Sequence, residues 1–92
     1  MTIKTPTEAP RDADALALAA LAATLTDERR AQRFLELTGI GTDELRARAG
    51  EPALLTALLQ FLEAHEPDLI EVARLIDSTP SQLVAARWSL ER

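Results

Sequence analysis

One short segment holds the side chains best suited to chemistry, namely Glu63, His65, Glu66 and Asp68. Carboxylate and imidazole groups bind metal ions, but a site on a helix usually needs a second histidine at helical spacing. His65 is the only histidine of the chain, and Pro67 interrupts the segment. A single histidine in the last turn of a helix more often meets the helix dipole or solvent. We therefore expect no metal site here.

The rest of the sequence does not predict catalysis either. The chain has no Cys and no Tyr, and it contains neither a GxSxG turn nor a phosphate-binding glycine loop. These absences remove several common nucleophiles and the best-known cofactor cradles. We expect a protein that is not an enzyme, with no catalytic residue and no cofactor.

Composition indicates one globular domain. The chain has 92 residues, of which 47% are hydrophobic and 27% charged, as in soluble proteins with a single core. Residues 1–11 contain two prolines and show no periodicity, so we expect a disordered tail followed by one helical domain over residues 12–92. The absence of Cys suits a reducing compartment, and the longest uncharged stretch, residues 15–26, is too short to cross a membrane. We expect a cytoplasmic protein without a membrane segment.

The net charge of −5 comes from one segment. Residues 51–71 carry five acidic side chains and neither Lys nor Arg, whereas the rest of the chain is balanced. An acidic protein repels phosphate backbones on average, because nucleic-acid affinity depends mainly on charge neutralisation. We expect a basic or uncharged partner and not a nucleic acid.

Caps, prolines and glycines along the chain predict helices throughout and no strand. The first expected helix follows a cap at residue 12 or 14 and runs to about residue 25, and the second covers residues 27–38. The others cover residues 43–49, 52 to 64 or 65, 67–76 and 80–90. The fourth has Leu or Phe over most of its circumference, so it should lie at the centre. We predict an all-α fold, a compact bundle of five to six short helices around a central Leu-rich helix.

Two further expectations concern the first two helices. Asp12 or Asp14 should cap the first, whose inner face should consist of Leu18, Leu21, Ala22 and Leu25. Thr26 should cap the second, and its arginines should point outward, namely Arg29, Arg30 and Arg33.

The sequence LTGIGTDELRAR joins the second and third helices. Gly39 suits the left-handed conformation that ends a helix in a Schellman arrangement, and Thr42 suits the N-cap of the next helix. The same glycine pattern is the core of the helix-hairpin-helix motif, whose amides hold a DNA phosphate. Here Asp43 and Glu44 would face that phosphate and repel it. We interpret the segment as a helix-capping corner.

Residues 69–88 resemble the helix-turn-helix of bacterial repressors. Ala73 matches the small residue of the first helix, and Leu83 matches the buried aliphatic residue of the second. Asp77 stands where that turn usually has Gly, and the second helix offers few cations for phosphate contact. A DNA-binding regulator acting through this segment is the alternative function.

A wider resemblance covers residues 15–90. It is carried by the strings RFLELTGI, DELRARAGEPALL and LLQFLEAHEPDLIEVARL. These strings resemble a family of short bacterial proteins catalogued as domain of unknown function 3572, in which DELRARAG followed by Pro or Asp and an apolar helix is the most recognisable piece. The resemblance implies a helical fold of this length, and it brings no activity, ligand or partner. The DSTPS segment departs from the Gly-containing turn expected before the last helix.

Since no chemistry is predicted, we expect a small protein–protein interaction or regulatory module that binds an unknown protein partner or forms a homodimer. Candidate contacts are Arg46 and Arg48 on the short third helix and Trp88 on the last. The position of Trp88 within its helix favours the core or its edge over a binding platform. A carrier with an apolar pocket lined by Leu58 and Leu62 is a third alternative.

Overall fold

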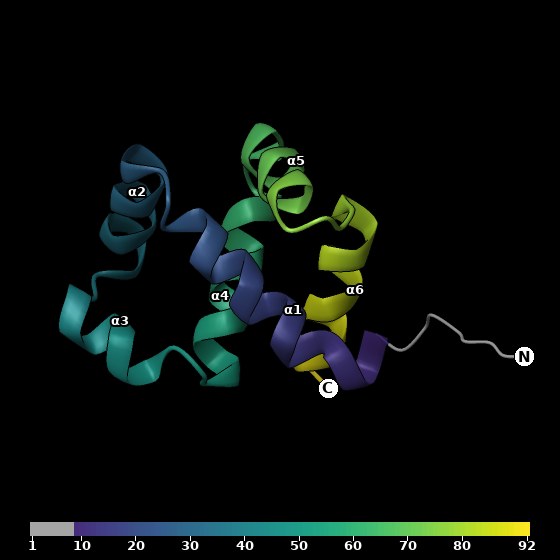
Figure 1. Cartoon of the computed structure of the whole chain (residues 1–92). Helices are drawn as coiled ribbons and strands as arrows, with labels where there is room; N and C mark the ends of the chain where they lie inside the picture. Colours follow the sequence, from purple (N-terminus) through teal and green to yellow (C-terminus); the bar gives the residue numbers. More distant parts are fainter. Residues whose placement is uncertain (1–8) are drawn as a thin grey trace, which may run out of the picture.

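The computed structural model describes residues 9–92, most of which belong to six α-helices (Figure 1). They are α1 (Ala9–Thr24), α2 (Glu28–Thr38), α3 (Thr42–Arg48), α4 (Pro52–Glu63), α5 (Glu66–Leu75) and α6 (Pro80–Leu90). No strand occurs in this range, so the predicted all-α bundle is confirmed. The tail expected over residues 1–11 lies mostly outside the described residues, and α1 already begins at Ala9.

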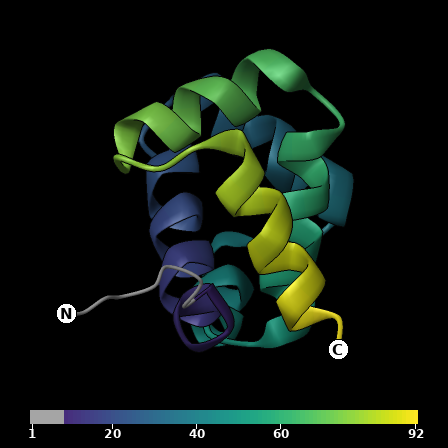
Figure 2. The same ribbon diagram turned by 90° about the vertical axis from the view of Figure 1, so that its right-hand side faces the viewer.

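The central helix is α4, as its composition predicts. Pro52 opens it, and its large apolar side chains are all buried, namely Leu54, Leu55, Leu58, Leu59, Phe61 and Leu62. Both α1 and α6 pack against α4 and most extensively against each other, and α5 closes the top of the bundle (Figures 1 and 2). None of the helices in the described range is long and apolar enough to span a bilayer.

The predicted inner face of α1 is wrong in part. Leu21 is buried, but Leu18 and Leu25 are 46% and 37% exposed. The buried side of the helix consists mainly of small residues, namely Ala13, Ala17, Ala20, Leu21, Ala23 and Thr24. Small side chains let the axes of packed helices approach closely, and α1 uses them against α6 and α4. Asp12 and Asp14 both lie inside the helix, so neither is its N-cap.

The caps of α2 and α3 each lie one residue away from the predicted position. Asp27, not Thr26, is the N-cap of α2, and its carboxylate accepts a hydrogen bond of 3.0 Å from the Arg30 backbone N–H. Gly41 is the N-cap of α3, so Thr42 is the first helical residue and its hydroxyl does not cap.

Two turns use a residue in the left-handed region. Gly39 ends α2 at φ 75° with a single hydrogen bond, from its N–H to the Leu35 carbonyl at 2.8 Å. That bond defines the simple αL motif and not the expected Schellman motif. The Schellman bond instead follows α5, where Asp77 has φ 60° and the Ser78 N–H donates to the Ala73 carbonyl at 2.8 Å. Asp77 therefore adopts the left-handed conformation for which a glycine was expected in this turn.

Helices α2 and α3 form an arm at one side of the bundle (Figure 1). Phe34 of α2 is fully buried and meets Phe61 of α4 edge to face, with 5.3 Å between ring centroids. Leu45 provides the buried side chain of α3. The arm is thus joined to the core by few side chains.

Candidate functional site

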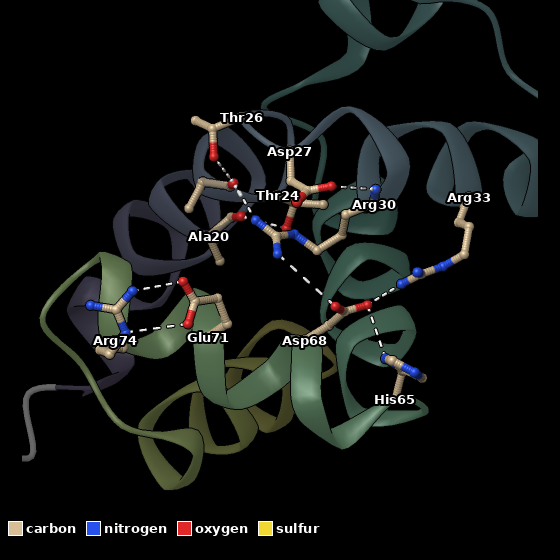
Figure 3. A network of polar contacts seen from close by, with 11 residues as sticks. Ala20, Thr24, Thr26, Asp27, Arg30, Arg33, His65, Asp68, Glu71 and Arg74 are labelled. Atoms are coloured by element: carbon tan, nitrogen blue, oxygen red, sulfur yellow. Dashed lines mark hydrogen bonds and ion pairs between the residues drawn. The ribbon is translucent and has the colours of Figure 1, made fainter.

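Arg30 is buried, contrary to the outward orientation predicted for it (Figure 3). Its guanidinium donates a hydrogen bond of 3.2 Å to the Ala23 carbonyl, in the last turn of α1. The same carbonyl accepts from the Thr26 hydroxyl at 2.7 Å. A cation at a helix C-terminus complements the helix dipole. Arg30 therefore fastens α2 to the end of α1.

Asp68 of α5 is the second centre of this network (Figure 3). Its carboxylate is largely buried, accepts a hydrogen bond from Arg33 and pairs with Nδ1 of His65 at 3.1 Å. The Arg30 guanidinium lies 4.0 Å away, at the limit of an ion pair. Since these donors come from α2 and from the start of α5, the network holds the arm against the bundle.

The acidic cluster around His65 is divided between two ion-pair networks. Glu63 faces α6, where its carboxylate binds Arg87 through two contacts of 2.5 and 3.1 Å. Asp68 faces α2 instead. Within residues 9–92 no group of three potential ligands is arranged to hold a metal ion. Glu63 and Asp68 thus join α4 to α6 and α5 to α2, respectively.

The two arginines of α3 differ in their surroundings. Arg48 is held by Glu44 at 3.1 Å and by Glu51 at 2.9 Å, so it links the end of α3 to the N-cap of α4. Both hydrogen bonds, that to Glu51 first, raise the pKa of Arg48 above its usual value. The Arg46 side chain is 79% exposed, and its one ion pair in the described range, with Asp43, is long at 3.8 Å. Of the two arginines, Arg46 is therefore the more exposed and the less closely paired.

Trp88 lies on the surface, and its predicted place in or beside the core is wrong. The residue is 60% exposed, whereas Leu83 and Ala86 supply the buried side of α6. These small and aliphatic residues suit close packing against the Ala-rich side of α1. The Arg87 guanidinium carbon lies 5.6 Å from the centroid of the indole. Trp88 is thus a solvent-exposed aromatic side chain next to the Arg87 cation.

A shallow depression of about 500 Å³ runs along α2 to its C-terminal turn. Its lining residues are Glu28, Ala31, Gln32, Leu35, Glu36, Gly39 and Ile40. Leu58 and Leu62 do not line it, because both are fully buried in the core. The pocket expected for a carrier therefore does not coincide with this depression.

The resemblance of α5 and α6 to a helix-turn-helix extends to the core positions and to the left-handed conformation of Asp77 in the turn. Ala73 and Leu83 are buried as that motif requires. Arg87, however, is tied to Glu63 and, at 3.0 Å, to Glu91. These hydrogen bonds, that to Glu63 first, raise the pKa of Arg87 above its usual value. The paired guanidinium weighs against a phosphate contact at this helix.

Comparison with known families decides the membership of the chain. The model of a family described as protein of unknown function, DUF3572, matches residues 10–92. The chain belongs to the DUF3572 family. No curated protein and no solved structure matches it significantly. The family assignment agrees with the resemblance seen in the sequence and adds no activity.

In this DUF3572 protein, most of the acidic segment is engaged internally. Four of its five carboxylates pair with arginines, as Glu51–Arg48, Glu63–Arg87, Asp68–Arg33 and Glu71–Arg74. The partners of Glu63 and Asp68 lie 24 and 35 residues away in the chain, so no local pattern reveals them. Sequence reasoning therefore missed the structural role of Arg30, Arg33 and Arg87.

Proposed function

We propose that this DUF3572 protein is a protein–protein interaction module. The exposure of Trp88 carries the proposal, since an indole of this size is among the side chains that dominate binding energy at interfaces. Glu63 and Glu91 hold the Arg87 guanidinium beside the indole ring. Because the two side chains are already restrained, they would lose little conformational entropy on binding.

The two α3 arginines enter this proposal unequally. We assign to Arg46 a contact with an acidic group of the partner, because its own pair with Asp43 is long and exposed, whereas Arg48 is engaged by two glutamates. The partner is another protein or a second copy of this chain. If the module is regulatory, it acts by binding to this partner. We place the module in the cytoplasm, because a chain without Cys suits a reducing compartment.

Affinity capture from the source cell, read by mass spectrometry, tests the proposal. The wild-type chain should enrich a partner that the Trp88→Ala variant loses, and the Ile70→Ala variant is the control, since Ile70 is 50% exposed on another helix. Because Trp88 is the only Trp, its fluorescence reports directly on the contact. Sedimentation of the purified chain separates a homodimer from a foreign partner. A monomer that captures nothing, with equal results for all three chains, would contradict the proposal.

A further inference from the structure

The depression along α2 combines an apolar floor with a negatively charged rim. Ala31, Leu35 and Ile40 are partly buried and form the floor, and the exposed Glu28 and Glu36 stand at its edge. Ala31 and Leu35 are one helical turn apart, so their side chains lie on one flank of α2. Gly39 turns the chain at φ 75°, which places Ile40 at the end of the same flank.

The rim carboxylates differ from most acidic groups of residues 51–71. In the described range neither Glu28 nor Glu36 forms an ion pair, whereas four of the five acids in residues 51–71 do. Glu36 accepts one hydrogen bond of 3.1 Å from Gln32, a neutral donor. Among residues 9–92, no Lys or Arg lines the depression. Its negative charge is therefore available to a cation from outside.

The spacing of these groups defines the shape of the complementary partner. Glu28 and Glu36 are eight residues apart, about 12 Å along a helix axis. A partner helix that follows α2 presents side chains at this separation when they are seven or eight residues apart. Its apolar side chains at the intervening third and fourth positions would then meet Ala31 and Leu35.

We propose that this depression is a docking site for a basic amphipathic helix of another protein. Two Lys or Arg side chains of that helix pair with Glu28 and Glu36, and one or two aliphatic side chains cover Ala31, Leu35 and Ile40. The proposal rests on the proposed function as an interaction module and names the class of partner for a second surface, distinct from Trp88.

The test uses a synthetic peptide of about 15 residues with a Leu face at helical spacing and two Lys seven residues apart. A matched peptide has Glu in place of both Lys. We expect the basic peptide to shift the amide NMR signals of residues 28–40 in a saturable way, more strongly at low salt, and the acidic peptide to leave them unchanged. The Glu28→Gln/Glu36→Gln variant should bind the basic peptide about fivefold more weakly, the loss expected for two exposed ion pairs.

The Asp43→Asn/Glu66→Gln variant is the control, because it changes the net charge equally at exposed sites outside the depression. It should bind as the wild type does. Ala31→Lys should abolish binding by filling the floor with a cation, and its amide spectrum shows whether it folds; the Gln variants test the site independently of that outcome.

The docking site would be overturned by equal weakening in the control variant, by equal binding of the acidic peptide, or by the absence of any binding at low salt. Shifts confined to α6 would also overturn it, yet they would leave the proposed function standing, since Trp88 lies there. If the wild-type chain self-associates and the Gln variant does not, the occupant is a second copy and the proposed partner is wrong.

Discussion

The Arg30 guanidinium of α2 and the Ala23 carbonyl of α1 are joined by a hydrogen bond of 3.2 Å. The two residues are only seven positions apart, yet the bond closes the corner between two helices. The Thr24 hydroxyl supports the same corner by donating to the Ala20 carbonyl at 2.8 Å. Side chains thus donate hydrogen bonds to carbonyl groups in the last turns of α1. These bonds fix the direction in which α2 leaves α1.

Removal of the Arg30 side chain should therefore loosen this corner. Arg30→Ala deletes the bond to Ala23 and the contact with Asp68, and it exposes the surface covered by the aliphatic stem. We expect the free energy of unfolding in urea to fall by about 1–3 kcal/mol. Arg29→Ala, an exposed neighbour, should change it by less than about 0.5 kcal/mol. Equal effects of the two variants would show that Arg30 does not stabilise the contact between α1 and α2.

Stability should fall at acid pH through the α2 cap. The Arg30 backbone N–H donates a hydrogen bond to the Asp27 carboxylate and thereby lowers the pKa of Asp27. The hydrogen bond from the Arg74 side chain lowers the pKa of Glu71 in the same way. A carboxyl whose folded-state pKa is depressed contributes stability above its unfolded pKa, about 4, and loses it as pH falls through the folded value. Asp27→Asn retains an oxygen cap but does not titrate, so the decline between about pH 5 and pH 2 should be shallower. Urea unfolding at several pH values measures it, and an unchanged slope would refute the assignment.

The parts of the fold that are coded locally could be predicted from the sequence. The Leu-rich circumference of α4 requires burial on every side, whatever surrounds it. Thr79 followed by Pro80 and Gln82 predicts the start of α6, and the Thr79 hydroxyl does accept from the Gln82 N–H at 3.1 Å. In such segments one stretch of chain contains both partners of the interaction.

The remaining features depend on partners distant in the chain. On α1 both Leu and Ala faces are apolar, and the choice of the Ala face reflects close packing against α6, which periodicity cannot report. Trp88 is a large apolar residue of the kind found in cores, but it lies on a different face of α6 from the buried Leu83. The paired arginines meet carboxylates in other helices. Candidate surfaces therefore emerged only once the helices were packed.

The two glycines of the α2–α3 turn should respond differently to substitution. Gly39 has φ 75°, so Gly39→Ala places a Cβ in a conformation that costs about 1–2 kcal/mol. Gly41 has φ −90°, and no atom lies within 4 Å of a Cβ built there. Gly41→Ala should therefore leave the urea midpoint almost unchanged. Comparable losses for both variants would mean that the turn requires close approach at both glycines, as a phosphate-binding hairpin does.

The DNA-binding alternative can be tested through Arg87. Because Glu63 and Glu91 hold its guanidinium, a labelled duplex titrated at low salt, where electrostatic affinity is greatest, should show no binding by the wild-type chain. The fluorescence of Trp88, 5.6 Å from that guanidinium, provides a second readout of any contact. Arg87→Ala separates the outcomes. Saturable binding by the wild type that Arg87→Ala abolishes would establish the alternative, whereas weak binding that survives in the variant would be non-specific attraction elsewhere.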